Sequence, residues 1–362
     1  MDVALLDDIE DERTRYQVDG LLPMGGNALV VAKRKTGKST FLLGLARSLR
    51  TGEPFLGALD VEPISGRVAY LNYEVPRTML KRWAHDVGLT SADMLTVNLR
   101  GRRNPLGHEL DLDELRAQLV AHDVEILLVD PLSRAFTGAN INDTGEMTAF
   151  LARLDELSAD GGASSIVLAA HAGWNNERAR NSSAVEDWPD SIVNLTTDAH
   201  GRRYLSAIGR DVELEEDLLE FDKARRRFTL SGAGGRRVTT AAEHMAALVD
   251  AVVTVVSSEP GLPTGELEAR LRDRGHAFQK GDVSKAATVA EGSRRIVRKR
   301  QGRVVQHFPS DVPRHAPTYP GGVDDVPQHP LIGGGVRPGY IEDNMPQAVE
   351  LVSEYLGAEV IP

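Results

Sequence analysis

The segment Ala32-Lys33-Arg34-Lys35-Thr36-Gly37-Lys38-Ser39-Thr40 decides the fold of this chain. It follows the aliphatic run 28–31, which predicts a buried strand, and it precedes a helical pattern over residues 41–49. A strand, a turn that reads Gly-Lys-Ser and a helix together form the Walker A pattern of a phosphate-binding loop. The pattern begins with glycine, and Ala32 is a tolerated variant at that position.

The residue types in this loop suit the binding of ATP and Mg²⁺. Gly37 allows a tight turn, so that consecutive backbone N–H groups point at the β-phosphate. Lys38 would neutralise charge on the β- and γ-phosphates, and the Ser39 hydroxyl would ligate Mg²⁺. We therefore predict that residues 32–40 bind ATP with Mg²⁺ and that the nucleotide is hydrolysed. Three further basic residues could contact phosphates or be solvated loop charges: Lys33, Arg34 and Lys35.

Two later strands are expected to end in carboxylates near this loop. The mostly apolar run 124–130 ends in Asp130, which would hold the Mg²⁺ shell. Pro131 comes next, where many ATPases carry their water-activating glutamate. The strand 67–73 is followed by Glu74, which we predict to be the general base for the attacking water. The alternative for Glu74 is a surface glutamate at a strand end.

A third strand end carries a histidine. His171 follows the aliphatic run 165–170. A polar residue at that point commonly senses the γ-phosphate, so His171 is a candidate sensor. A histidine that is satisfied by structural contacts gives the same sequence.

Strand-like runs alternate with helical patterns over residues 18–230, which predicts an α/β core with a mainly parallel sheet. The predicted strands are 28–32, 67–73, 124–130, 165–170, 191–195, 203–210 and 227–230. The predicted helices are 39–49, 77–87, 112–121 and 146–159.

The chain is expected to hold a second, smaller domain. An acidic N-terminal segment (1–17) precedes the core (18–230), and a glycine-rich linker (231–238) follows it. Helical patterns at 239–258, 264–274 and 282–298, followed by an extended run at 303–308, indicate a winged-helix-like domain over 239–309. Residues 310–362 form a Pro/Gly-rich acidic tail with a short helical pattern at 346–356.

Composition narrows the functional classes. The chain has 362 residues and no cysteine, which excludes disulfides, thiolate nucleophiles and cysteine-ligated zinc. The acidic N-terminus lacks the features of a signal peptide, and no uninterrupted apolar run approaches the ~20 residues of a membrane span. We expect a soluble cytoplasmic protein that has no membrane partner.

The motifs resemble those of RecA-type P-loop ATPases, and among them the plasmid hexameric replicative helicase RepA and its phage and actinobacterial relatives. The resemblance covers roughly residues 18–230. The segments that carry it are residues 18–23, Asn72-Tyr73-Glu74, Asp130-Pro131-Leu132 with Asn142-Asp143, His171-Ala172-Gly173, Arg180-Asn181-Ser182-Ser183-Ala184 with Asp187 or Asp190, and Gly209-Arg210-Asp211.

This resemblance implies a homo-oligomeric ring, usually a hexamer, with ATP bound between subunits. Arg210 occupies the place of the arginine that reaches the γ-phosphate of the next subunit. The alternatives are that Arg210 pairs with Asp211 or another surface acid, or that Arg202 or Arg203 takes the role. Relatives bind single-stranded DNA through two loops, here 136–145 and 173–181. The second contains three residues suited to DNA: Trp174, Arg178 and Arg180.

The predicted small domain contains a strongly basic stretch. Residues 291–303 hold six basic side chains and one acidic side chain. In a winged helix this stretch would form the end of the last helix and the start of the wing, which face DNA. A solvated helix end is the alternative. The predicted DNA contacts are Arg294, Arg295, Arg298, Lys299 and Arg300.

These patterns lead to one hypothesis with two rivals. The favoured function is a Mg-ATP-dependent, ring-forming DNA motor or remodelling ATPase, helicase-like, acting on single-stranded or branched DNA in replication or recombination. One rival is a RecA-like recombinase that forms filaments on DNA. The other is an ATP-switched DNA-binding regulator. Outside the Walker residues the sequence offers no metal-carboxylate cluster for a nuclease.

Overall fold

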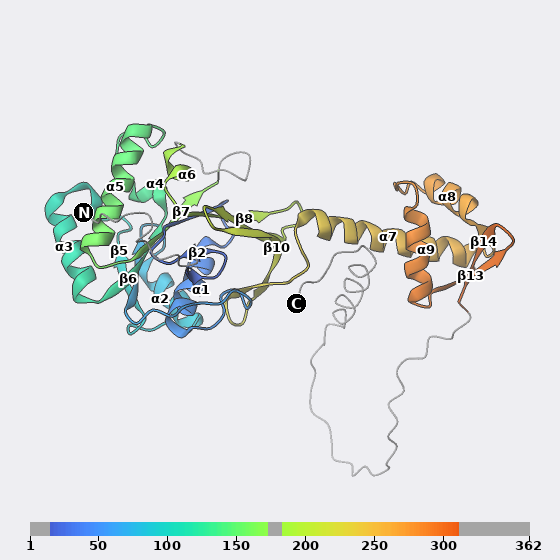
Figure 1. The fold of residues 1–362 in the computed structure, drawn as a ribbon, viewed down its shortest axis with the longest axis horizontal. Coiled ribbons are helices and arrows are strands. Elements are labelled where there is room, and N and C mark those ends of the chain that lie inside the picture. The colour runs from blue at the N-terminus through green and yellow to red at the C-terminus, as the bar shows by residue number, and fades with distance from the viewer. Residues whose placement is uncertain (1–14, 173–182, 311–362) are drawn as a thin grey trace, which may run out of the picture. The chain divides into compact units, whose positions relative to one another are not determined.

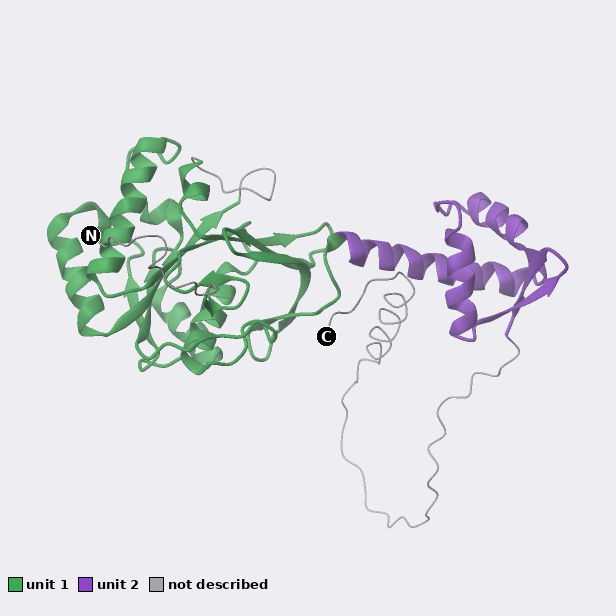
Figure 2. Ribbon diagram, viewed as in Figure 1, with its two compact units in different colours: residues 1–236 green, residues 237–362 purple. Residues whose placement is uncertain are grey.

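The computed structural model describes residues 15–172 and 183–310. The chain divides into two compact units, Met1–Arg236 and Arg237–Pro362 (Figure 2). Each unit has its own hydrophobic core. The boundary falls inside the predicted linker, residues 231–238.

The first unit is built on a nine-stranded sheet with the order β11-β10-β9-β8-β3-β7-β6-β4-β5 (Figure 1). Six neighbouring strands are parallel: β8 (Ser191–Thr197), β3 (Ala28–Ala32), β7 (Ser165–His171), β6 (Val124–Asp130), β4 (Arg67–Asn72) and β5 (Met94–Asn98). Three antiparallel strands complete the sheet: β9 (Arg203–Gly209), β10 (Glu213–Asp222) and β11 (Arg227–Leu230). The predicted α/β class with a mainly parallel sheet is confirmed.

Helices cover both faces of the parallel strands, and the central strands β3, β7 and β6 are mostly apolar. On one face lie α1 (Lys38–Thr51) and α2 (Arg77–Asp86), and on the other lie α3 (Glu109–Ala121) and α5 (Thr144–Asp160) (Figure 1). The smaller elements are β1 (Tyr16–Val18), β2 (Leu22–Pro23), η2 (Pro105–Gly107), α4 (Leu132–Ala135) and α6 (Ala184–Asp187).

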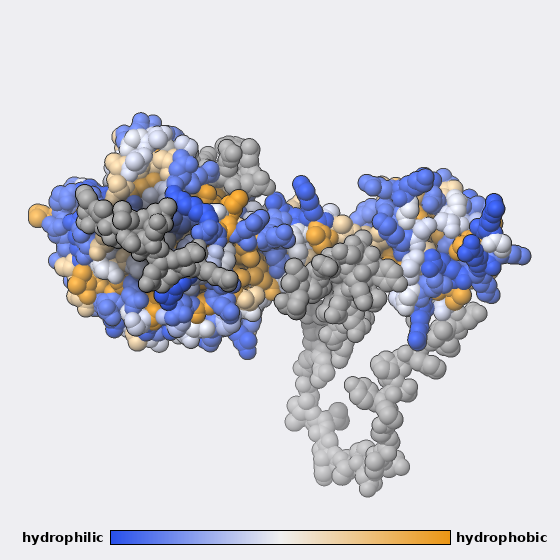
Figure 3. Space-filling view, viewed as in Figure 1, coloured by the Kyte–Doolittle hydropathy of each residue, from blue (hydrophilic) through white to orange (hydrophobic). Residues whose placement is uncertain are grey.

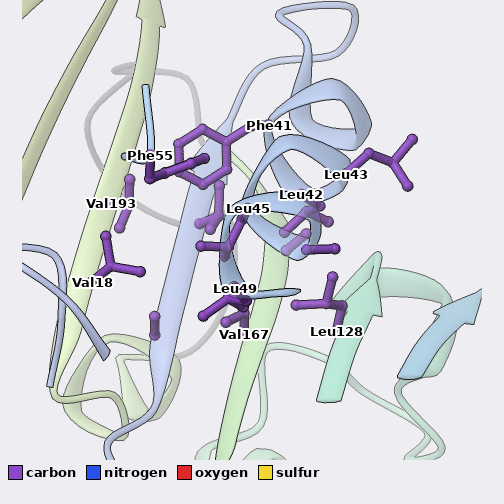
Figure 4. Packing of buried hydrophobic residues seen from close by; sticks show 14 of the residues in the cluster. Val18, Phe41, Leu42, Leu43, Leu45, Leu49, Phe55, Leu128, Val167 and Val193 are labelled. Atoms are coloured by element: carbon purple, nitrogen blue, oxygen red, sulfur yellow. The ribbon is translucent and has the colours of Figure 1, made fainter. Parts of the chain in front are cut away.

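Helix α1 is fixed to the sheet by one apolar side. Phe41, Leu45 and Leu49 are fully or almost fully buried, and they point toward Val193 and Val167 on the strands (Figure 4). The Phe41 ring meets that of Phe55 edge-on, with ring centroids 5.0 Å apart. This packing holds the N-terminus of α1 at the end of β3, where the Gly-Lys-Ser turn lies.

The second unit contains three helices and a three-stranded antiparallel sheet with the order β12-β14-β13. Its elements are α7 (Arg236–Ser258), β12 (Leu262–Pro263), α8 (Thr264–Asp273), α9 (Asp282–Gly292), β13 (Ile296–Gln301) and β14 (Val304–Pro309). Its surface is mostly hydrophilic on the face that Figure 3 shows. The winged-helix assignment stays a prediction.

The predicted helix 282–298 is wrong in its last turns. Helix α9 ends at Gly292, Arg294 has a φ of 56°, and β13 begins at Ile296. Lysine and arginine suit a helix, but Ile296 and Val297 pair with Pro309 and Phe308 across a β-hairpin. Of the five predicted DNA contacts, Arg298, Lys299 and Arg300 therefore lie on a strand, and Arg294 and Arg295 lie in the turn before it.

Helix α7 is the predicted helix 239–258, extended by three residues at its start. With 23 residues it is the one helix of the described ranges that is long and apolar enough to cross a membrane. Its apolar run is interrupted by Asp250. Leu248, Val252 and Val256 of α7 are buried in the core of the second unit, which is the behaviour of a core helix. Cytoplasmic localisation stays a prediction.

Candidate nucleotide-binding site

The Gly-Lys-Ser turn joins the central strand β3 to α1. All five residues of β3 are buried, and the chain turns at Gly37, which has a φ of 116° and is the N-cap of α1. A Cβ atom at Gly37 would lie 2.6 Å from the Phe228 ring, so both the backbone and the neighbouring side chain require glycine. Because α1 begins at Lys38, its free N–H groups face the space above the loop.

The loop is held in shape by two contacts to backbone oxygens. The Thr36 hydroxyl donates to the carbonyl oxygen of Lys33 at 2.9 Å. Arg203, the first residue of β9, donates through Nε to the carbonyl oxygen of Thr36 at 2.8 Å. Sequence reasoning considered Arg203 only as a possible contact to another subunit, yet the structure places it beside its own loop.

Asp130 and Ser39 form the part of the site that suits Mg²⁺. Oδ2 of Asp130 accepts hydrogen bonds from Ser39 Oγ (2.9 Å) and from the Tyr70 hydroxyl (2.6 Å). The residue is 2% exposed, and Oδ1 has no hydrogen-bond partner within the described part of the chain. A buried carboxylate oxygen without a partner, next to a hydroxyl, is a donor set that fits Mg²⁺. The remaining ligands would be phosphate oxygens and waters.

Tyr70 on β4 orients the aspartate. Burial first, and then the negative charge of Asp130, raise the pKa of the Tyr70 hydroxyl well above its usual value. Tyr70 therefore stays protonated and remains a hydrogen-bond donor to Oδ2, which leaves Oδ1 available. Sequence reasoning missed Tyr70, although its position two residues before Asn72 on a buried strand is visible in the sequence.

Glu74 lies in a turn that Asn72 shapes. The Asn72 side chain donates to the carbonyl oxygen of Val75 (2.7 Å) and accepts from the N–H groups of Glu74 (3.3 Å) and Val75 (2.9 Å). The buried asparagine thus fixes the backbone, while the Glu74 side chain is exposed and lines the same cavity as Lys38. A carboxylate in this position can accept a proton from a water in the cavity.

Lys38 and His171 contact each other. Lys38 Nζ donates to His171 Nδ1 at 2.8 Å, and His171 lies at the end of β7 beside Ala32. Burial lowers the pKa of Lys38, while Asp130 and Glu74 oppose this effect. The pKa of His171 is lowered first by burial and then by the charge of Lys38. His171 is therefore neutral, as a group that accepts from an ammonium must be.

The lowered pKa of His171 predicts how stability depends on pH. In the unfolded chain His171 titrates near its usual value of 6.5, whereas the folded protein keeps it neutral to lower pH. The unfolded state then binds more protons, so this contribution to stability is full above pH 6.5 and is lost as the pH falls toward the folded pKa. We expect urea unfolding to show that the free energy of unfolding falls more between pH 7.5 and 5.5 for the wild type than for His171→Gln. Equal losses would contradict the buried, neutral histidine.

These residues surround one cavity of about 580 Å³, a volume within the range of small-molecule sites. Its lining includes the polar and charged residues Lys38, Ser39, Asp130 and Glu74 and three aromatic residues. The residues that line it are Lys33, Arg34, Lys35, Gly37, Lys38, Ser39, Thr40, Glu74, Val75, Trp83, Asp130, Arg134, His171, Arg203, Phe221, Arg226 and Phe228. Of the predicted loop residues, only Ala32 and Thr36 do not line it.

Arg210 lies away from this cavity. The neighbouring Gly209 pairs with Ser191, which pairs with Ala28 at the opposite end of β3 from the loop. The Arg210 side chain is 73% exposed and forms an ion pair with Asp190 at 3.1 Å. The role of Arg210 in a neighbouring subunit stays a prediction. Within its own subunit, Arg210 lies far from the phosphate-binding loop.

The predicted DNA contacts fall into two groups. Trp174, Arg178 and Arg180 lie outside the described residues. In the second unit, Arg298 is bound to Glu291 at 2.6 Å and Arg295 to Asp250 at 2.7 Å. Lys299 lies over the Phe308 ring at 5.0 Å, and Arg300 donates to the carbonyl oxygen of Gly302.

Residues 1–177 match the family model of an AAA domain. The matched segment contains the loop, Asp130, Glu74 and His171, and it ends before β8. A search of curated proteins finds no match to the chain. The match suggests a domain of the P-loop ATPase class, in agreement with the geometry of the cavity.

Proposed function

We propose that the chain is a Mg-ATP-hydrolysing DNA motor or remodelling ATPase, a proposal that the match of residues 1–177 to the family model of an AAA domain supports. In this proposal it works as a ring of identical subunits on single-stranded or branched DNA and is related to the RepA helicases. The observation that carries ATP hydrolysis is the convergence of Lys38, Asp130 and Glu74 on one cavity.

The chemistry divides among the residues of the cavity. Lys38 and the N–H groups of the loop bind the phosphates, and Ser39 with Asp130 would hold Mg²⁺. When bound, Mg²⁺ neutralises charge on the phosphate oxygens. Glu74 takes the proton of the attacking water. His171, which contacts Lys38 in the free protein, would donate a hydrogen bond to a γ-phosphate oxygen when Lys38 turns toward the nucleotide.

The DNA-directed part of the proposal is supported by the β13–β14 hairpin. Lys299 and Val297 lie on the same face of β13, and Val297 is 39% exposed. The ammonium group of Lys299 can therefore contact a phosphate backbone. Arg300 is also exposed, whereas Arg298 and Arg295 already contact carboxylates. We therefore assign the larger share of DNA binding to Lys299 and Arg300.

The ring is supported by the position of Arg210. A guanidinium group that is largely exposed at the sheet edge opposite the loop could contribute to ATP hydrolysis only in the cavity of another copy. Electron micrographs of the protein with DNA and ATP should show closed rings, whereas filaments along the DNA would favour the recombinase.

DNA binding by the hairpin is tested with the double variant Lys299→Ala/Arg300→Ala. Loss of two phosphate contacts should weaken binding to labelled single-stranded DNA about tenfold at low salt and reduce the slope of log K against log salt by about 2. Fluorescence anisotropy measures both. The matched control is Arg270→Ala/Arg272→Ala, which removes the same charge from α8.

Equal weakening in both double variants would contradict a role specific to the hairpin. Tight binding restricted to one duplex sequence, with slow ATP turnover, would instead favour the regulator.

A further inference from the structure

We propose that Trp83, together with the turn between β10 and β11, forms the subsite for the nucleobase of the bound nucleotide, and that Arg226 covers this subsite in the free protein. The inference rests on the proposed binding of a nucleoside triphosphate at the Gly-Lys-Ser loop. It adds a binding surface for the base and a side chain that must move to expose it.

The first observation is that one cavity is lined by both charged and aromatic side chains. Lys38 and Asp130 are among the charged residues, and they suit phosphates and Mg²⁺. Three aromatic side chains line the same cavity: Trp83 from α2, Phe221 from β10 and Phe228 from β11. A nucleotide has the same two-part chemistry, because its phosphates are anionic and its base is a planar ring that stacks on aromatic side chains.

The second observation is the position of Arg226. Its guanidinium carbon lies 4.1 Å from the centre of the Trp83 ring. A base between the two groups would need a contact distance of roughly 3.5 Å on each side, so it cannot enter between this guanidinium group and the indole. The base and Arg226 therefore compete for the same face of Trp83.

The third observation is that Arg226 is held there at a cost. Its Nε atom is buried and has no hydrogen-bond partner within the described residues. Burial also lowers the pKa of Arg226, while Asp86 opposes this effect and Arg82 adds to it. A cation with an unsatisfied donor is released more readily than one in an ion pair.

The backbone of the turn is anchored independently of Arg226. Arg227 binds Glu53 at 3.2 Å, and the Asp222 carboxylate accepts from the N–H groups of Ala224 and Arg225 at 2.8 and 3.1 Å. The rings of Phe221 and Phe228 are 5.2 Å apart across the hairpin. The Arg226 side chain can therefore move while the hairpin stays in place.

The ligand class follows from this arrangement. Stacking on Trp83 recognises the plane of a base and not its hydrogen-bonding edge, so the subsite should accept purines with little discrimination between adenine and guanine. The Gly-Lys-Ser loop alone should bind inorganic tripolyphosphate. The comparison between ATP and tripolyphosphate therefore isolates the contribution of the base.

The test measures Kd for Mg-ATP and for Mg-tripolyphosphate by titration calorimetry on the full chain. Trp83→Ala should weaken ATP binding by about 5- to 100-fold, the range for loss of one base–aromatic stack, and leave tripolyphosphate binding unchanged. Trp83→Phe, which keeps a ring, should retain most of the ATP affinity. Arg226→Ala should tighten ATP binding about two- to tenfold, because the base no longer displaces the cation. Arg225→Ala, which removes the same charge from a 78% exposed position in the same turn, should leave both affinities unchanged.

Three results would overturn the subsite. They are equal losses for ATP and tripolyphosphate in Trp83→Ala, unchanged ATP affinity in both Trp83 variants, and weaker ATP binding in Arg226→Ala. If Trp83→Ala fails to fold, Trp83→Phe and Arg226→Ala still decide the outcome. Wild-type protein that binds neither ligand would overturn the proposed nucleotide site itself, which distinguishes the two failures.

Discussion

Replacing Glu74 by glutamine is expected to lower kcat for ATP hydrolysis by about 10²–10⁴-fold, the usual contribution of a general base. The amide keeps the shape of the carboxylate but cannot accept a proton from water. The turn should be unchanged, because the Asn72 side chain holds the backbone of Glu74 and Val75. Phosphate release at saturating Mg-ATP measures the loss, and calorimetry should show that ATP still binds within a few-fold of the wild type.

The matched control for this substitution is Glu156→Gln, an exposed glutamate on α5 that does not line the cavity. It should leave kcat unchanged. If Glu74→Gln also retained the wild-type kcat, another group would have to activate the water, and the assignment of Glu74 would be wrong.

The second large loss of ATP turnover is expected for Lys38→Ala. Lys38 is 8% exposed and is directed into the cavity by α1, so no solvated side chain can replace its charge. Removing one preorganised positive group from a phosphate site costs about 10²–10³ in turnover. The substitution also leaves His171 Nδ1 without the donor that it has in the free protein. Phosphate release and ATP binding should therefore both fall.

Lys35→Ala provides the control for Lys38→Ala, because it removes the same charge from an exposed position in the same loop. We expect it to change turnover by less than the Lys38 variant. Full turnover in Lys38→Ala would show that the nucleotide binds elsewhere.

The loop and its carboxylates were predictable because their signals are local. A buried strand ends where its apolar run ends, and parallel strands of one sheet bring their carboxyl ends to the same edge. Each of these strands could therefore be used to place its terminal polar residue near Lys38, and the three residues are Asp130, Glu74 and His171. Helix α1 and strands β3 and β6 agree with the sequence reading to within one or two residues.

The aromatic residues of the cavity could not be found in this way. Strand β10 has six acidic residues among ten, a composition that disfavours strands, and pairing with β9 and β11 overrides it. Because β10 was missed, the turn that brings Arg226 over Trp83 was missed as well. The two residues are far apart in the sequence, and only the folded structure brings them together.

The basic hairpin shows the opposite error, in which a local signal misleads. A run of arginine and lysine after a helix reads as more helix, but β13 forms because it has β14 as a partner. The predicted residues are still in one place, but their side chains alternate between two faces of a strand. Arg298 therefore faces Glu291, whereas Lys299 is exposed.

The measurement that tests the account most directly is phosphate release from Mg-ATP by the wild-type protein, with and without single-stranded DNA. Lys38→Ala, measured beside it, gives the background. We predict turnover that rises when DNA is added and that is lost in the variant. Turnover equal to that of Lys38→Ala would contradict the ATPase site, and turnover that depends on Lys38 but ignores DNA would contradict the DNA motor.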